Sequence, residues 1–240
     1  MITLDLTIPT CWQELTPKQL RYAFFLISEG YTPEALKTYC LFRWTGIEVL
    51  APEGDGYAVR YQYNRYHFTT LQIAELISRL DWLDQLPLVP VRLHKIAGKT
   101  AAPADLQGLP FERYIYCDNL YQGYLHTKNT DLLVEMAAVL YNCPTIKLTP
   151  EERISIFYWF ASVKQLFSRK FYHFFTAAPA SQSLDIERQL TETMNAQIRA
   201  LTKGDITKEQ VVLQMDVWRA LTELDAQAAD YEELKKQPNA

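Results

Sequence analysis

The chain has 240 residues, with 28 acidic and 24 basic side chains and a formal net charge of −4 at pH 7. Hydrophobic residues make up 48% of it, which excludes a disordered tail and is enough to bury a core. The slight acidic excess also excludes the strongly basic composition that is typical of many nucleic-acid-binding proteins. With only 8 glycines, the sequence supplies few of the backbone turns that hold phosphate groups.

Charge is unevenly distributed along the chain. Residues 1–179 carry equal numbers of acidic and basic side chains, so the whole net charge of −4 lies in residues 180–240. The segment 176–183 is small, polar and uncharged, which is typical of a linker. We therefore predict a boundary at Pro179, between a mostly helical α+β domain and an acidic C-terminal helical hairpin.

The first elements are predicted from short local patterns. Residues 2–8 alternate between apolar and polar side chains, which predicts a half-buried strand. Thr-Pro pairs at 16–17 and 32–33 each supply a cap oxygen and a proline for the first helical position. Two short helices should follow these pairs and end at Gly30 and Gly46.

A β-hairpin with one aromatic face is predicted near residues 47–68. The turn at 52–56 is rich in proline and glycine, and tyrosines recur at alternate positions in the strand predicted over 57–68. Thr69 and Gln72 then form a capping box, which predicts the start of another helix.

The middle of the chain is predicted to be helical. After an extended passage that begins at Pro87, periodic patterns predict helices over residues 111–126, 131–141 and 150–175. The last of these helices carries aromatic side chains on several faces, so we expect it to be central and covered on several sides.

Residues 180–240 are predicted to form two antiparallel helices joined by a turn at 203–205. Each helix has a one-sided apolar stripe, which suits packing within the hairpin and docking on a partner helix. We expect Trp218 to be partly buried and to meet Met194 or Ile198 across the turn. The candidate interaction residues are Met194, Ile198, Leu201, Val211, Met215, Trp218, Leu221 and Leu224.

The tripeptide Gly98-Lys99-Thr100 invites comparison with a phosphate-binding P-loop. That motif also requires a glycine five residues before Gly98, where this chain has Leu93. Nucleotide binding at this point is therefore not expected.

The strongest grouping of acid, base and metal-binding residues is Asp118, His126, Asp131 and Glu135. Asp118 and His126 are eight residues apart on one predicted helix and share a face, but a solvated face with a capping Asp131 explains the same spacing. The histidines do not form the pairs that helix-borne zinc or di-iron sites use. We predict no catalytic, cofactor-binding or metal-binding residue, and an enzyme with a site assembled only in space remains the lesser alternative.

The cysteines are widely separated and none belongs to a Cys-x-x-Cys pair. We therefore expect reduced thiols in a cytoplasmic protein. No export signal or lipid anchor is expected at the N-terminus. The apolar run at 154–163 is about half as long as a membrane-spanning helix needs to be, so we expect no membrane association.

The segment 57–68 interleaves aromatic side chains with Arg60, Arg65 and His67, a mixture on which single-stranded nucleic acid could stack. A strand that buries its aromatic face explains the same pattern. Residues 1–179 have no net charge to supply electrostatic affinity. Nucleic-acid binding is not expected, but a nucleic-acid-associated accessory factor is the main alternative function.

Two stretches carry a resemblance to a known group of proteins. One is Phe111-Glu-Arg-Tyr-Ile-Tyr-Cys-Asp-Asn-Leu-Tyr-Gln-Gly-Tyr-Leu to Leu140-Tyr141. The other runs from Ile198-Arg-Ala-Leu-Thr-Lys-Gly-Asp-Ile-Thr-Lys to Trp218-Arg-Ala-Leu-Thr-Glu-Leu. They resemble uncharacterised proteins encoded among the structural genes of tailed phages and prophages of gut bacteria. The resemblance covers the second half of the chain and implies a tail-assembly chaperone or a virion connector component, without assigning any functional residue.

The sequence thus predicts a predominantly helical α+β protein with a non-catalytic role in phage particle assembly, as a chaperone or a structural component. Its partners would be other phage assembly or virion proteins, with a homo-oligomer as an open alternative. The expected location is the cytoplasm of the host cell or the virion, and no cofactor is expected.

Overall fold

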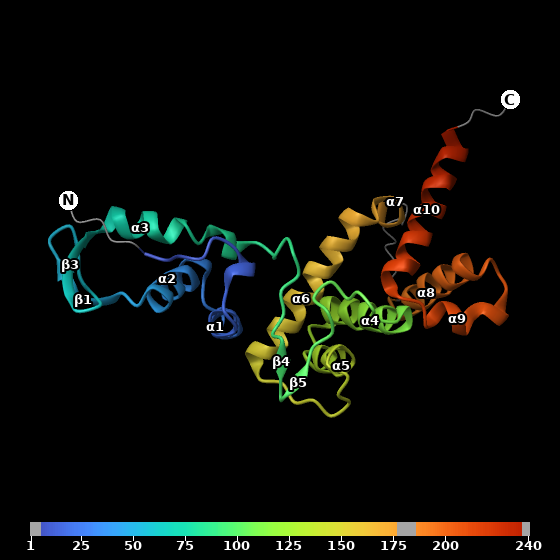
Figure 1. Cartoon of the computed structure of the whole chain (residues 1–240), viewed down its shortest axis with the longest axis horizontal. Helices are drawn as coiled ribbons and strands as arrows, with labels where there is room; N and C mark the ends of the chain where they lie inside the picture. The colour runs from blue at the N-terminus through green and yellow to red at the C-terminus, as the bar shows by residue number, and fades with distance from the viewer. Residues whose placement is uncertain (1–5, 177–185, 237–240) are drawn as a thin grey trace. The chain divides into compact units, whose positions relative to one another are not determined.

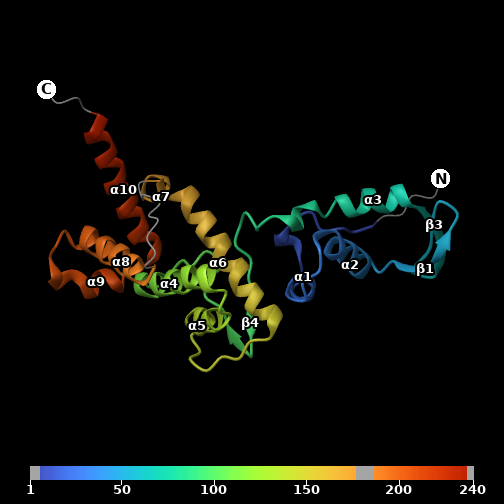
Figure 2. The ribbon, with the colours of Figure 1, turned by 180° about the vertical axis from the view of Figure 1, so that it is seen from behind.

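The computed structural model describes residues 6–176 and 186–236. These residues are mostly helical, with a three-stranded antiparallel sheet near the N-terminus and a short two-stranded hairpin in the middle (Figures 1 and 2). The predicted fold class, a predominantly helical α+β protein, is confirmed.

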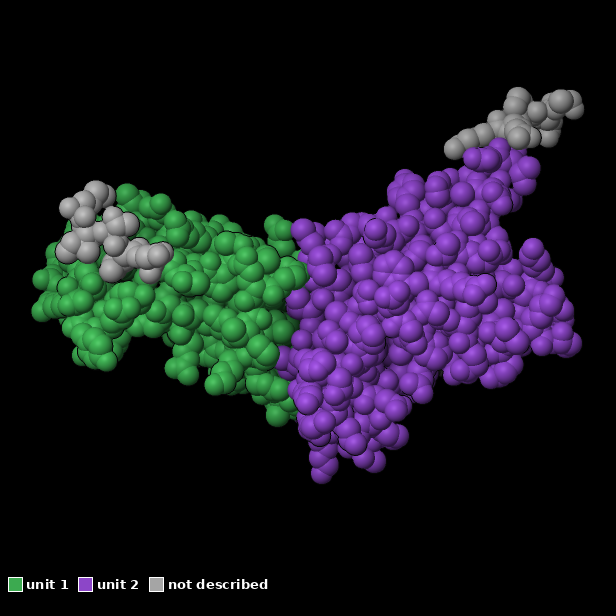
Figure 3. All heavy atoms as spheres, in the orientation of Figure 1, with its two compact units in different colours: residues 1–87, 149–158 green, residues 88–148, 159–240 purple. Residues whose placement is uncertain are grey.

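Contacts divide the chain into two compact units, coloured separately in Figure 3. Unit 1 contains residues 1–87 and 149–158, and unit 2 contains residues 88–148 and 159–240. The boundary predicted at Pro179 lies outside the described residues. The described helices beyond it belong to unit 2.

Unit 1 begins with a single turn, η1 (Trp12–Glu14), followed by α1 (Pro17–Ser28) and α2 (Pro33–Thr45). Thr16 and Gln19 close a capping box at the start of α1. Gly46, with φ of 74°, ends α2 in the left-handed conformation that glycine adopts without strain. Both helix predictions are confirmed. The strand predicted over residues 2–8 is not confirmed. Residues 6–8 do not form a strand, and residues 1–5 lie outside the described part of the chain.

The sheet consists of β1 (Glu48–Glu53), β2 (Gly56–Tyr61) and β3 (Asn64–Thr69), paired in that order. The strand predicted over 57–68 is therefore wrong in its length, because the chain folds back at Gln62 and forms a second hairpin. Tyr61 pairs with Asn64, and Gln62 has φ of 55°. The alternation of side chains continues through this turn, so the pattern by itself did not reveal it.

The sheet is covered by α3 (Thr70–Ser78), which starts with the predicted capping box between Thr69 and Gln72. Ile47, Val59 and Phe68 form the core beneath this helix. Beyond α3, the short helix η2 (Asp81–Asp84) is tied to α2 by Lys37, whose ammonium contacts the carboxylates of η2 at 2.7 and 2.9 Å. The hydrogen bonds to these carboxylates raise the pKa of Lys37.

Unit 2 begins with a passage that includes the strands β4 (Lys95–Ile96) and β5 (Lys99–Thr100). Its helices are α4 (Phe111–Thr127), α5 (Asp131–Leu140), the part of α6 (Pro150–Lys170) beyond Tyr158, α7 (Tyr172–Thr176), α8 (Ile186–Thr202), η3 (Ile206–Lys208), α9 (Glu209–Leu213) and α10 (Val217–Lys236). The helix predicted over 150–175 is thus confirmed, with an interruption at Phe171 between α6 and α7.

Helix α6 supplies the aromatic centre of unit 2. Trp159, Phe160 and Phe167 are fully buried. The ring of Tyr114 on α4 lies 6.0 Å from that of Phe160 and 5.5 Å from that of Phe167. The prediction that this helix is central is borne out within unit 2.

One ion pair lies among these rings. The ammonium of Lys164 on α6 is 2.8 Å from a carboxylate oxygen of Asp118 on α4, and both side chains are mostly buried. Burial alone would lower the pKa of Lys164, but Tyr114 and Asp118 outweigh it, so the pKa of this ammonium is raised. The ammonium of Lys164 therefore stays charged through the ordinary pH range.

None of the helices within residues 6–176 and 186–236 is both long enough and apolar enough to cross a membrane.

We predict that Lys164→Met will lower the free energy of unfolding by about 2–3 kcal/mol, because it leaves the Asp118 carboxylate mostly buried and unpaired. Urea denaturation followed by circular dichroism measures the change. The matched control is Arg60→Met, which breaks the exposed pair with Glu48 and should cost less than about 1 kcal/mol. If Lys164→Met and Arg60→Met lowered the free energy of unfolding equally, the buried pair would have no special stabilising role.

Candidate interaction surface

The second helix of the predicted C-terminal hairpin is divided in the structure. Residues 214–216 separate α9 from α10 because they pair with the segment that precedes α4. The backbone N–H of Phe111 donates to the carbonyl of Met215 at 2.8 Å, and the N–H of Val217 donates to the carbonyl of Leu109 at 2.9 Å. The predicted second stripe is therefore wrong as a continuous helical face.

Asp216 fixes the start of α10 from both sides. One carboxylate oxygen accepts a hydrogen bond from the backbone N–H of Gly108 at 2.5 Å, and the other accepts from the N–H of Arg219 at 3.2 Å. A carboxylate that accepts from the first turn of a helix satisfies N–H groups that have no partner inside the helix. The side chain thus caps α10 and holds it to the loop before α4.

The eight candidate residues differ widely in exposure. Three are buried, namely Ile198, Leu221 and Leu224. Four are half-buried, namely Met194, Leu201, Met215 and Trp218. Val211 alone among the eight is strongly exposed, at 68%. Three of the eight residues therefore belong to the interior of unit 2, and Val211 is the one that lies mostly in solvent.

Trp218 is half-buried, as expected, and its aromatic neighbours lie on the helix α6 and just beyond it. Its ring lies edge-on against Phe167 at 5.5 Å and against Phe171 at 5.6 Å, at the end of α6. Its indole N–H donates to the carbonyl of Asp105 at 2.8 Å. These contacts make Trp218 an anchor that joins α10 to α6, and its contact with Met194 or Ile198 stays a prediction.

The exposed apolar side chains of this region lie around η3 and α9. Ile206 is 82% exposed and Val211 is 68% exposed. Ile206 also borders a hollow of about 320 Å³, together with Ile198 and Thr202 at the end of α8. We call Ile206 and Val211 the η3–α9 patch. Ile206 falls in the turn between the two periodic segments, so apolar periodicity does not identify it.

A second exposed apolar area is the distal end of α10. Tyr231 is 59% exposed and Leu234 is 66% exposed. Figures 1 and 2 show this end of the helix extending beyond α7. Helix α10 is held to α7 at two points: the N–H of Phe174 donates to Asp225, and His173 lies 3.1 Å from Glu232, next to Tyr231.

The structure places Gly98-Lys99-Thr100 in a β-turn and strand. Ala97 and Gly98 have φ of 47° and 75° and connect β4 to β5. A P-loop lysine and hydroxyl residue instead open a helix whose N-terminus faces the phosphates. The local geometry therefore agrees with the expectation that this segment is not a P-loop.

Two members of the acidic and histidine grouping near α4 have partners outside that grouping. Asp118 is paired with Lys164, and Glu135 accepts a hydrogen bond from the hydroxyl of Tyr116 at 3.1 Å. In the described part of the chain, no three histidine, cysteine or acidic residues lie close enough to hold a metal ion.

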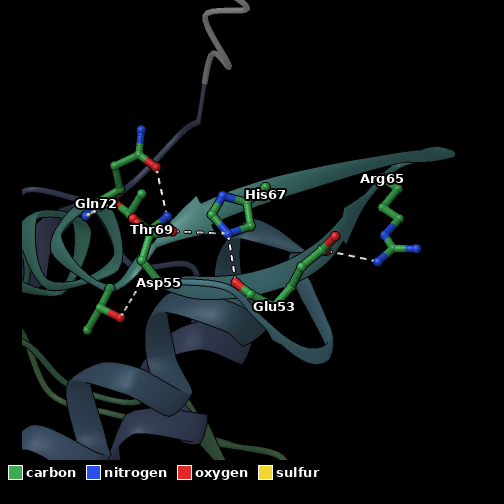
Figure 4. A network of polar contacts seen from close by, with 7 residues as sticks. Glu53, Asp55, Arg65, His67, Thr69 and Gln72 are labelled. Atoms are coloured by element: carbon green, nitrogen blue, oxygen red, sulfur yellow. Dashed lines mark hydrogen bonds and ion pairs between the residues drawn. The ribbon is translucent and has the colours of Figure 1, made fainter.

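The arginines of the sheet have acidic partners on β1. Arg60 contacts Glu48 at 2.5 Å, and Arg65 contacts Glu53 at 2.9 Å. Figure 4 shows Arg65 directed toward Glu53, and His67 beside the carbonyl of Glu53 at 2.9 Å. Each arginine charge is thus balanced within the sheet, which opposes attraction of a phosphate backbone.

Comparison with protein-family models, with curated proteins and with solved structures found no match to the chain. The resemblance of residues 111–141 and 198–224 to phage structural-gene proteins therefore stays a prediction. The proposed function below therefore rests on the geometry of the described residues.

We predict that Trp218→Ala will lower the free energy of unfolding by about 3 kcal/mol, since it removes a half-buried ring and its contacts with α6. Trp218→Phe keeps a ring and loses the hydrogen bond to Asp105, which should cost about 1 kcal/mol. Chemical denaturation measures both variants, with Val211→Ala as an exposed control expected within about 0.5 kcal/mol of the native chain. A Trp218→Ala variant as stable as the control would disprove the anchor.

We also predict that the chain will bind single-stranded DNA or RNA more weakly than about 10 μM at physiological salt. Replacing Glu48 and Glu53 by Gln should raise the affinity at low salt, because it releases Arg60 and Arg65. Fluorescence anisotropy with a labelled oligonucleotide measures both proteins. Tight, salt-sensitive binding by the native chain that is lost on replacing the two arginines would instead favour the nucleic-acid-associated alternative.

Proposed function

We propose that this protein is a non-catalytic protein–protein interaction component in the assembly of tailed-phage particles, acting as a chaperone or a structural protein. Its partners in this proposal are other assembly or virion proteins, met in the host cytoplasm or the particle. The observation that carries the proposal is the η3–α9 patch, where two branched apolar side chains are held in solvent beside a well-anchored helical unit.

The anchoring around the patch supports this interpretation. Trp218 and Asp216 fix α10 to the rest of unit 2 through carbonyl and N–H groups of residues 105–109. Exposed apolar residues on a rigid support lose little conformational entropy when a partner covers them. Val211 is also the most exposed of the eight candidate interaction residues predicted from the sequence.

The chemistry of the cysteines supports a non-catalytic role for them. Burial raises the pKa of Cys40 to about 12 and raises that of Cys117 as well. A thiol attacks as its thiolate, so these two groups stay protonated and unreactive at physiological pH.

The test is affinity capture from cells that express the full structural gene cluster of a tailed phage together with the tagged chain. Mass spectrometry identifies the captured proteins and the proteins of purified particles. We expect a tail or virion protein to be captured by the native chain. We also expect Ile206→Glu and Val211→Glu to reduce its recovery by about tenfold or more.

The controls separate docking from folding. Because both patch residues are exposed, the two substitutions should leave the melting temperature nearly unchanged. Tyr63→Glu makes the same kind of change at a fully exposed position of unit 1 and should leave capture intact. Failure to recover any phage assembly protein, or equal recovery by all variants, would refute the proposed role of the patch.

A further inference from the structure

The tryptophans of the chain show one exception to a common pattern. Four of the five indole N–H groups donate to a backbone carbonyl at 2.7–3.1 Å. These are Trp12 to Gln85, Trp82 to Pro9, Trp159 to Ala104 and Trp218 to Asp105. The indole nitrogen of Trp44 is buried and has no acceptor within the described residues. Buried hydrogen-bond donors are nearly always paired. An acceptor for the indole N–H of Trp44 would have to come from outside the described residues.

Trp44 forms one wall of the largest hollow in unit 1 among those described, with a volume of about 670 Å³. Tyr22 and Phe25 on α1 supply the other aromatic walls, and their rings are stacked at 6.5 Å. Phe25 is 42% exposed, whereas phenylalanine side chains are usually buried. The hollow therefore offers flat, exposed apolar surfaces.

Cationic groups surround these rings. Lys18, Arg21 and Arg43 all line the hollow. The guanidinium carbon of Arg43 lies 5.9 Å from the centre of the Tyr22 ring. Burial raises the pKa of Tyr22, so its hydroxyl stays neutral beside this cation.

The net charge of the side chains around the hollow determines which anion it favours. Arg21 contacts Glu152 at 2.7 Å and Glu151 at 3.9 Å, so its charge is satisfied by these two carboxylates. Lys18 and Arg43 form no ion pair among the described residues. Three cations against two carboxylates leave one positive charge, which matches a singly charged carboxylate better than a doubly charged phosphate.

The N-terminus of α1 does not compete for this anion. Thr16 and Gln19 also line the hollow, but their side chains and backbone N–H groups satisfy each other in the capping box. The donors available to a ligand therefore include the ammonium of Lys18, the guanidinium of Arg43 and the indole N–H of Trp44.

We propose that this hollow is a binding site for an aromatic carboxylate. The ring lies against Tyr22 and Phe25, and the carboxylate accepts hydrogen bonds from Arg43 and from the indole N–H of Trp44. A free aromatic acid and a peptide chain that ends in an aromatic residue both carry this chemistry. The site belongs to unit 1 and is independent of the η3–α9 patch.

The test is an NMR titration of the full chain with its tryptophan indoles labelled with ¹⁵N. The probe is 3-phenylpropionate, and 3-phenylpropionamide is the neutral probe of the same shape. The Trp44 signal is assigned by its loss in Trp44→Phe. We expect the acid to shift this signal and to bind about tenfold or more tightly than the amide.

Two variants connect the affinity to the proposed donors. Arg43→Gln should weaken binding of the acid by about tenfold, and Trp44→Phe should weaken it by about threefold. Arg60→Gln removes another exposed arginine of unit 1, on the sheet, and should leave the affinity unchanged. The four remaining indole signals report whether each variant is folded.

Three results would overturn the proposal: equal binding of acid and amide, tighter binding of phenyl phosphate than of the acid, or an unchanged Trp44 signal. A peptide ending in Gly-Gly-Phe separates the two sources of the ligand. Tighter binding of the peptide than of 3-phenylpropionate assigns the site to a protein C-terminus, and weaker binding assigns it to a free aromatic acid.

Discussion

The need to cover aromatic rings on several faces of one helix organises both units. Helix α6 carries large rings over most of its circumference, and no single layer of structure can bury all of them. Its first turns contribute Tyr158 to unit 1, where the ring lies 5.5 Å from Phe24 and 5.8 Å from Trp12. Its later turns contribute Trp159, Phe160 and Phe167 to unit 2. Each unit therefore depends on a different stretch of the same helix.

Large rings also bring polar atoms into the interior, and the chain satisfies most of them with backbone carbonyls of irregular segments. Trp159 and Trp218 donate to Ala104 and Asp105, two neighbouring residues of the passage before α4. That passage is thereby tied to both α6 and α10. A segment with little regular structure becomes a fixed part of unit 2 because it satisfies buried donors.

Ion-pair and hydrogen-bond partners also distinguish the side chains that stabilise the fold from those that are available to a ligand. Lys164 and Asp118 are paired within unit 2, and the arginines of the sheet are paired with glutamates on β1. Arg43 and Lys18 have no such partner within the described residues, and they lie beside Trp44, whose indole N–H is unsatisfied there. Unpaired charge, exposed rings and an unpaired donor thus meet in one hollow.

Local signals in the sequence determined the helices and their ends. Thr16, Thr69 and Gly46 act within one turn of their own helix, so their effect does not depend on the rest of the fold. The apolar periodicity likewise determined the helical class and the central position of α6 in unit 2. Such signals also excluded a P-loop at Gly98, since the required residue types were missing.

The tertiary structure alone decided which apolar residues remain exposed and which polar groups meet. The pairing of residues 214–216 with the segment before α4 broke a stripe that was continuous in sequence, because backbone hydrogen bonds to a distant segment replaced those of a helix. Arg21, Trp44 and Glu151 meet only after α1, α2 and the start of α6 pack together. Periodicity records which face of an element is apolar, but the identity of the element that covers this face depends on contacts between residues far apart in the chain.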